Sequence, residues 1–299
     1  MPRRFYTLDV FASQALAGNP LAVVLDAEGL DDDAMQRIAR EFSLSETVFV
    51  SEPRNPVNTA AVRIFTPTRE LPFAGHPTVG TAALLAHLRA PDLLASQDLR
   101  VVLEEKIGEV VCVARHRRGE AMAAYFTVPR LPERAGEAPP AAALAEGLGL
   151  EAADIGFRNH VPSVYGVGAP HIFIPVARLD AMARANPLKT PWGADGGPSV
   201  YLYCPETAGA DANYHARMFA GGWGIAEDPA TGSAAASFAA VVAAFDRPAD
   251  GEHMLLIEQG YEMGRPSLIS LGIEIEAGAL ASATIGGSAV IVSEGKLRL

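Results

Sequence analysis

The chain has 299 residues, of which 49% are hydrophobic and 20% charged, a composition typical of a globular protein with a large core. Its formal net charge of −11 disfavours binding to nucleic acid or to an anionic membrane surface, since both carry negative charge. Two cysteines are too few for a disulfide framework, and the N-terminal residues show no secretory signal, so we expect a cytoplasmic protein.

The first half of the chain predicts short strands around one buried helix. Apolar, β-branched runs bounded by Gly and Pro predict strands at 22–25, 48–50, 62–65 and 110–114, and Arg117–Glu120 predicts a hairpin turn into a strand at 122–128. Residues 77–89 are apolar nearly all round and begin with proline, which predicts a buried helix. Glu104, Glu105 and Lys106 predict a turn, with Lys106 on the surface.

The second half repeats this plan. Residues 229–245 are again apolar on every side with Pro229 at the start, and Asp228 just before them is a candidate N-cap. The longest apolar run, 234–245, is too short to cross a bilayer, so we expect no membrane partner. The segment 131–140, rich in Pro, Ala and Glu, is the candidate boundary between the halves.

Three motif pairs recur in the same order at a spacing of about half the chain. They are GNP at 18–20 and GAP at 168–170, VRIF at 62–65 and ARMF at 216–219, and HPTVGTAA at 76–83 and DPATGSAA at 228–235. We infer two homologous lobes, an N-terminal lobe at 1–130 and a C-terminal lobe at 131–284.

Motifs for bound cofactors are missing from the sequence. There is no Gly-rich loop followed by Lys and Ser or Thr, no complete dinucleotide fingerprint, no HExxH helix and no Cys-x-x-Cys pair. We therefore expect no cofactor and no metal, and an enzyme of this kind would rely on its own acids and bases.

The starts of the two buried helices are candidate anion sites. A helix N-terminus has unpaired N–H groups and a partial positive charge, and Gly75, Gly80 and Gly232 would let a ligand approach the backbone. Two such ends facing each other across a cleft could hold a small anionic substrate without basic side chains. The alternative interpretation is that both segments are core helices with tight entry turns.

Six motifs along the chain resemble the phenazine-biosynthesis isomerase (PhzF-like) family, which has the diaminopimelate-epimerase fold. They are DVFASQALAGNPLAVVL, LSETVFV, VRIFTPTRELPFAGHPTVGTA, GWGIAEDPATGSAAA, EQGYEMGRPS and IGGSAVIV. The resemblance implies an α/β (α+β) fold of two pseudo-symmetric lobes, each a curved mixed sheet wrapped around a central buried helix. It also implies that residues 285–299 complete the first lobe, that the active site lies between the lobes, and that the protein is a homodimer.

The resemblance assigns roles to individual residues. The catalytic residues of the family fall on Glu46, His76, Asp228 and Ser233. Ser45, Gly75, Thr231 and Gly232 lie beside them, and we expect these four to bind substrate. Without the resemblance, Glu46 is a solvated strand residue, His76 a capping or core residue, and Ser233 a filler of a small-residue helix.

Epimerases of this fold use two cysteines, one at each helix entrance, and this chain has neither. Ala74 precedes Gly75-His76, where many PhzF-like proteins have cysteine, and Cys112 and Cys204 lie in predicted strands as buried structural residues. Racemisation by a thiol pair is therefore excluded. Arg63 and Arg217 occupy repeat-equivalent strand positions, where structural salt bridges and substrate contact are equally open.

The residues and the resemblance together predict an isomerase without a cofactor. Glu46 would move a proton within a small conjugated cyclic acid similar to dihydro-3-hydroxyanthranilate. Two alternatives stay open: an epimerase or racemase using Glu46 and Asp228 as non-thiol bases, and a non-catalytic protein that binds a small molecule.

Overall fold

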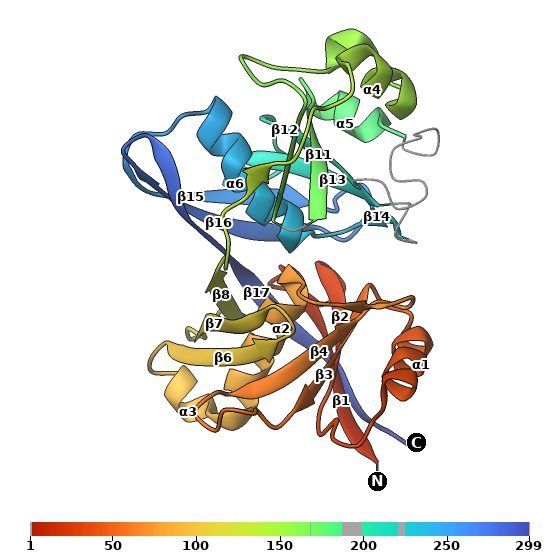
Figure 1. Cartoon of the computed structure of the whole chain (residues 1–299), viewed down its shortest axis with the longest axis vertical. Coiled ribbons are helices and arrows are strands. Elements are labelled where there is room, and N and C mark those ends of the chain that lie inside the picture. The colour runs from red at the N-terminus through yellow and green to blue at the C-terminus, as the bar shows by residue number, and fades with distance from the viewer. Residues whose placement is uncertain (1, 168, 187–198, 221–224, 299) are drawn as a thin grey trace. The chain divides into compact units, whose positions relative to one another are not determined.

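Figure 1 shows the computed structural model of the chain, which describes residues 2–167, 169–186, 199–220 and 225–298. The chain divides into two compact units: unit 1 comprises Met1–Thr127 with Gly286–Leu299, and unit 2 comprises Val128–Ile285. Each unit is a mixed sheet with one central buried helix, so the predicted fold class is confirmed. Gly168 of the GAP motif and residues 222–224 lie outside the described residues.

The sheet of unit 1 returns on itself around its helix. The last strand, β17 (Ala279–Leu297), pairs antiparallel with β1 from Arg3↔Leu297 to Val10↔Ala289, and it also pairs with β8. Within the sheet β2 and β3 are parallel, as are β4 and β6. The other strands are β1 (Arg3–Val10), β2 (Asn19–Val24), β3 (Glu46–Ser51), β4 (Ala60–Phe65), β5 (Glu70–Leu71), β6 (Leu99–Glu105), β7 (Gly108–Arg115) and β8 (Met122–Thr127).

The central helix of unit 1 is α2 (Gly75–Arg89), and α1 (Asp32–Phe42) and α3 (Pro91–Leu94) accompany it. Every residue of α2 from Gly75 to Ala86 is buried, which confirms the predicted buried helix, although it begins two residues before Pro77. A Cβ atom added at Gly80 would lie 2.6 Å from Val10 and 2.7 Å from Leu21. Gly80 therefore lets α2 pack against β1 and β2, and its predicted role in the approach of a ligand is wrong.

Unit 2 repeats the strand pairings of unit 1. Its parallel pairs, β11 with β12 and β13 with β15, correspond to β2 with β3 and β4 with β6. Its strands are β9 (Glu133–Arg134), β10 (Ser163–Val167), β11 (Ala169–Pro175), β12 (Ser199–Cys204), β13 (Tyr214–Ala220), β14 (Ile225–Asp228), β15 (Gly251–Gln259) and β16 (Ser267–Glu276). Its helices are α4 (Ala141–Leu148), the 3-10 turn η1 (Ala152–Asp154), α5 (Leu179–Arg184) and α6 (Gly232–Phe245).

The central helix α6 begins later than its sequence predicts. Thr231 is its N-cap, and Pro229 lies in the connection before it rather than in its first turn. Asp228 is the last residue of β14 and pairs with Met218, so its backbone is committed to the sheet. The prediction that Asp228 caps this helix is therefore wrong, because an N-cap must directly precede the first helical turn.

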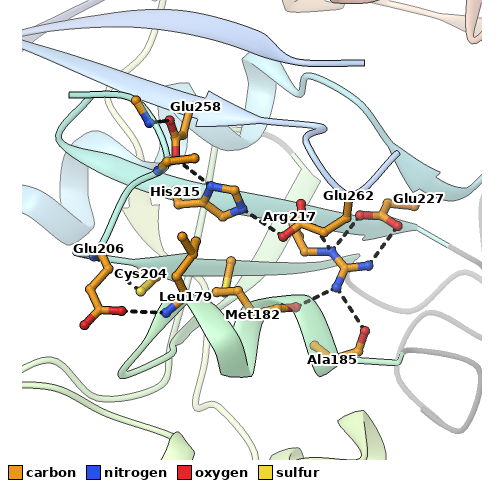
Figure 2. A network of polar contacts seen from close by, with 12 residues as sticks. Leu179, Met182, Ala185, Cys204, Glu206, His215, Arg217, Glu227, Glu258 and Glu262 are labelled. Atoms are coloured by element: carbon orange, nitrogen blue, oxygen red, sulfur yellow. Dashed lines mark hydrogen bonds and ion pairs between the residues drawn. The ribbon is translucent and has the colours of Figure 1, made fainter. Parts of the chain in front are cut away.

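The repeat-equivalent arginines form ion pairs inside their own units. Arg63 on β4 contacts both oxygens of Glu70 at 2.7 Å and Asp32 at 2.7 Å. Arg217 on β13 contacts both oxygens of Glu227 at 2.8 and 3.0 Å, and it also donates to two carbonyl groups in and just after α5 (Figure 2). Of the two roles that the sequence leaves open for these arginines, both therefore have the first, a structural salt bridge.

A polar network fastens the end of β15 to its neighbours in unit 2 (Figure 2). Nδ1 of His215 lies 2.7 Å from Glu258, and Nε2 lies 2.9 Å from Glu262. Glu258 also accepts hydrogen bonds from the backbone amides of Ala208 and Gly209 at 2.6 and 2.9 Å. Burial lowers the pKa of His215, but the hydrogen bonds to Glu262 and Glu258 outweigh burial and raise it overall.

In the described part of the chain, no helix combines the length and the apolar character that are needed to cross a membrane.

The His215 network predicts a pH-dependent contribution to stability. Because the folded-state pKa lies above the ordinary value of about 6.5, the contribution is complete below that value and is lost as the pH rises through the folded-state pKa. The difference in unfolding free energy between wild type and His215→Gln, measured by urea titration from pH 5.5 to 9, should therefore shrink with increasing pH. A difference that does not change with pH would contradict a charged His215.

Candidate functional site

Glu46 stands at the start of β3, directly after the half-buried Ser45. β3 runs parallel to β2, and the pairing Leu21↔Glu46 brings the first residue of β3 beside the middle of β2. The side chain of Glu46 is 13% exposed, and its Oε2 atom lies 3.4 Å from Nε2 of His76. Glu46 is therefore largely withdrawn from solvent and next to the first turn of α2, and it is not the solvated strand residue of the alternative interpretation.

His76 lies in the first turn of α2 and is an uncharged imidazole. Burial lowers its pKa to about 3, which a hydrogen bond to the backbone of Pro20 only partly offsets. Proline has no N–H group, so the imidazole donates this bond to the carbonyl oxygen. Nε2 has no hydrogen-bond partner, so the donor is Nδ1 and Nε2 faces Glu46 as an acceptor. His76 therefore places no positive charge beside Glu46.

The entrance of α2 has backbone donors and no side-chain cap. Its N-cap is Ala74, whose side chain makes no capping hydrogen bond. The first hydrogen bond within the helix runs from the amide of Thr78 to the carbonyl oxygen of Ala74 at 3.2 Å. The amides of Gly75 and His76 precede this bond, so they belong to the group that a helix leaves without intrahelical partners.

The entrance of α6 in unit 2 brings together three of the predicted residues. The hydroxyl of Thr231 donates to Oδ2 of Asp228 at 2.5 Å, and Gly232 begins the helix. Ser233 follows in the first turn and is half-buried, so its side chain has partial access to solvent. The first hydrogen bond within the helix runs from Ala235 to Thr231 at 2.9 Å.

Two side chains that the sequence does not single out lie near this entrance, and the first of them makes hydrogen bonds with it. Gln259, the last residue of β15, donates to the carbonyl of Asp228 at 2.7 Å and to the hydroxyl of Thr231 at 3.1 Å. Its carbonyl accepts from the amide of Thr231 at 3.2 Å. The second is Tyr201 on β12. It pairs with Met218 on β13, and Met218 in turn pairs with Asp228 on β14.

Tyr201 faces α6, since directly paired residues of neighbouring strands share one face of a sheet. Its ring lies 6.1 Å from that of Phe238 on α6, and its hydroxyl oxygen is buried without a hydrogen-bond partner. Burial and the nearby charge of Asp228 raise the pKa of the Tyr201 hydroxyl, which stays protonated. An unpaired buried hydroxyl costs about 1–3 kcal/mol, so Tyr201 is a donor that a bound polar group would stabilise.

The duplication places a different residue at the unit 2 equivalent of Glu46. His171↔Ser199 is the counterpart of the pairing Leu21↔Glu46, so Ser199 takes the place of Glu46. Ser199 lies 2.6 Å from Nδ1 of His171, whose pKa burial lowers to about 4. Unit 2 therefore has a neutral Ser-His pair where unit 1 has a carboxylate.

The structure brings the predicted residues together in two groups. Glu46 and His76 meet in unit 1, and Asp228, Thr231 and Gly232 meet in unit 2; that the two groups face each other stays a prediction. Within the described residues, no group of three or more His, Cys, Asp or Glu side chains could hold a metal ion. Both cysteines are buried in strands as predicted, and burial raises the pKa of the Cys204 thiol to about 11.

The environment of His76 predicts that its ring does not titrate near neutrality. Its ¹⁵N chemical shifts should show a neutral ring with hydrogen on Nδ1 from pH 5 to 8, since its folded pKa is about 3. His253, whose ring contacts a backbone carbonyl at an exposed position, is a matched reference in the same spectrum. A charged His76 at pH 6 would contradict the geometry described here.

Comparisons with known proteins agree along the whole chain. The family described as "Phenazine biosynthesis-like protein" matches residues 8–295. An uncharacterized isomerase of Mesorhizobium japonicum is 48% identical, covering 99% of this chain and 98% of its own. The trans-2,3-dihydro-3-hydroxyanthranilate isomerase of Pseudomonas fluorescens is 35% identical, covering 99% of both chains.

Solved structures give the same result. A PhzF-family protein of Bacillus anthracis superposes with a TM-score of 0.88 at 27% identity and full coverage of both chains. A hydroxyproline epimerase of Agrobacterium vitis shares the fold alone, with a TM-score of 0.63 at 14% identity over 99% of this chain and 91% of its own. By its whole-chain match and its relatives, the chain belongs to the family of phenazine biosynthesis-like (PhzF-like) isomerases.

Proposed function

We propose that this protein moves a proton within a small conjugated cyclic carboxylic acid, similar to dihydro-3-hydroxyanthranilate, with Glu46 as the acid and base. The observation that carries the proposal is the contact of 3.4 Å between Glu46 and a neutral His76 at the entrance of α2. The named activity of the Pseudomonas relatives supports the substrate class.

The reaction needs one carboxyl group that acts twice. The Glu46 carboxylate takes a proton from a ring carbon, and the electron pair of the broken C–H bond spreads into the conjugated system. The protonated Glu46 then donates the proton to another carbon of that system, and a double bond changes position. Nothing is oxidised or reduced, and Glu46 ends as the carboxylate with which it began.

His76 would orient Glu46 between the two steps. Its Nδ1 hydrogen is committed to Pro20, which leaves Nε2 as an acceptor on the side of Glu46. When Glu46 carries the proton, Nε2 can accept a hydrogen bond from it and hold the carboxyl group in place. An uncharged ring suits this task, because a cation at this distance would stabilise the carboxylate and oppose proton uptake.

The entrance of α6 would bind the polar groups of the same substrate. The amides of its first turn, at Gly232 and Ser233, and the hydroxyl of Ser233 would donate to a carboxylate. Asp228 would accept from an amino or hydroxyl group, as would be expected for a cyclic amino or hydroxy acid. The resemblance further implies that the working unit is a homodimer.

The strand pairings of unit 2 favour a mechanism with one base over a mechanism with two, because they place no carboxylate at the position equivalent to Glu46. The unit 2 equivalent of Glu46 is Ser199, whose hydroxyl is not a base at neutral pH, and its neighbour His171 is a weak base because burial lowers its pKa to about 4. An epimerase of this fold would need a second base elsewhere, with Asp228 as the candidate, and Asp228 already accepts a hydrogen bond from Thr231.

Replacing Glu46 by Gln tests the assigned base. The amide has nearly the same size but cannot take up a proton, so turnover should fall by about 10²-fold or more while substrate binding persists. Steady-state kinetics of isomerisation and calorimetric binding of the substrate measure the two effects. Glu52→Gln, an exposed site just after β3, is the matched control and should leave turnover unchanged. Full activity in Glu46→Gln would refute the assignment.

Turnover in deuterium oxide separates the three functions. A single base should give a product with a relocated double bond, and any deuterium should enter on the face from which the proton left. NMR of the product reports both the position and the face. Inversion at one carbon with solvent deuterium would instead indicate a two-base epimerase, and binding without any hydrogen exchange would indicate a non-catalytic protein.

A further inference from the structure

A buried carboxyl group lies beneath the first turn of α2 and has no part in the proposed chemistry. Glu105, the last residue of β6, is 3% exposed, and its Oε1 atom lies 2.7 Å from the hydroxyl of Thr78. The sequence predicts a turn at Glu104 and Glu105 beside Lys106. In the structure, β6 continues through both glutamates before the chain turns.

The two contacts of the Thr78 hydroxyl can both be full hydrogen bonds only when Glu105 carries a proton. The Thr78 hydroxyl also lies 2.7 Å from the carbonyl oxygen of Ala74, which can only accept. Thr78 has one hydroxyl hydrogen, so if it donates to Ala74 the contact with Glu105 is a hydrogen bond only when Glu105 donates. The other oxygen of Glu105, Oε2, is buried without a hydrogen-bond partner, a costly state for a charged oxygen.

The surroundings of Glu105 do not compensate a negative charge. Burial raises its pKa to about 8, against the opposing effect of the hydrogen bond from Thr78. On β7 the nearby Cys112 thiol is neutral, because burial and the charge of Glu105 both raise its pKa. On α2 the only ionisable side chain near this end is the neutral His76, and Lys106 pairs with Glu70.

In unit 2 the position equivalent to Glu105 is occupied by an amide side chain, that of Gln259. Ala60↔Leu103 in unit 1 and Tyr214↔Ile257 in unit 2 are equivalent pairings between parallel strands. Two residues after Leu103 and Ile257 come Glu105 and Gln259, which are therefore equivalent.

The residues just before this pair confirm the equivalence. Glu104 accepts from the consecutive backbone amides of Arg54 and Asn55 at 2.9 and 2.8 Å. Glu258 likewise accepts from two consecutive backbone amides, those of Ala208 and Gly209 (Figure 2). Since neighbouring strand residues point to opposite faces, Glu105 and Gln259 both point toward the central helix of their unit.

Gln259 shows what this position does. It donates from Nε2 to Asp228 and to the hydroxyl of Thr231, and so holds the turn that begins α6. An amide never ionises in this pH range, so it remains a donor at every pH. Both halves of the chain thus place a hydrogen-bonding side chain under the entrance of the buried helix. In unit 2 it is an amide, and in unit 1 it is a carboxyl group, which can donate only while it is protonated.

We propose that Glu105 is a positioning residue that holds the entrance of α2, and with it His76 and Gly75, only while its carboxyl group is protonated. On the proposed function, on which this inference rests, alkaline conditions would then reduce turnover without any change at Glu46. Ionised Glu105 can only accept, so it draws the Thr78 hydroxyl hydrogen away from the carbonyl oxygen of Ala74, and it leaves a charge in an apolar core beside the first turn. The helix entrance shifts or loosens as a result.

The substitution Glu105→Gln, which copies unit 2, tests the proposal. Wild-type kcat should fall about tenfold from pH 7 to pH 9, as expected for the loss of one proton with a pKa of about 8. Glu105→Gln should keep the wild-type kcat at pH 7 and show no such fall, because its amide donates at every pH. Glu105→Ala, which removes the donor, should lower kcat at all pH values. If kcat of Glu105→Gln fell at alkaline pH as much as kcat of the wild type, the proposal would be overturned.

Two readouts are independent of substrate. Infrared difference spectra should show the C=O band of a buried protonated carboxyl group at pH 6.5, absent in Glu105→Gln; a spectrum without that band would overturn the proposal. Between pH 4.5 and 8 the unfolded chain releases the proton that folded Glu105 keeps, so wild-type stability should fall with rising pH by more than that of Glu105→Gln.

The reciprocal variant is Gln259→Glu, which places a second buried acid under α6. It should add a further pH-dependent loss of stability, and the absence of that loss would contradict the equivalence of the two positions. If the infrared and stability results are as expected but no acid is isomerised, the proposed function fails, while the inference that Glu105 is protonated and holds the entrance of α2 remains. If isomerisation is found but the carboxyl band is missing, the inference fails alone.

Discussion

Two apolar helices, each enclosed by a sheet, impose the main constraint on this protein. A buried helix satisfies its own backbone along its length but not at its ends, where several N–H groups have no partner within the helix. In both units these groups lie where the chain enters α2 and α6, and in neither does the N-cap side chain provide a capping bond. The entrances are thus held from outside the helix, by the last residue of a neighbouring strand.

The duplication preserves this support and changes the chemistry built on it. Equivalent positions hold Glu46 and Ser199, His76 and Asp228, and Glu105 and Gln259. At the first and third positions unit 1 has a carboxyl group and unit 2 a hydroxyl or an amide. At the second, unit 1 has a neutral imidazole and unit 2 a carboxyl group. The duplicated scaffold thereby carries different hydrogen-bonding groups in its two units.

The fold could be predicted from the sequence in outline because its signals are local. The apolar segments at 77–89 and 229–245 indicate buried helices, and the repeated motifs indicate two halves. The start of α6 could not be predicted, because Asp228 is drawn into β14 by its pairing with Met218, a contact that the local pattern of residues 228–235 does not reveal. Family motifs lead to Glu46 and His76. No local pattern leads to Tyr201, Gln259 or Glu105, whose roles depend on burial and strand register.

The strand β17 has a consequence for how the chain folds as it leaves the ribosome. β1, at Arg3–Val10, is among the first segments to be synthesised, yet its partner residues 289–297 follow almost a whole chain length later. The edge of β1 that pairs with β17 therefore has no partner strand while unit 2 is being translated. An unpaired strand edge is prone to pair with other chains, so nascent unit 1 is open to mispairing during that interval.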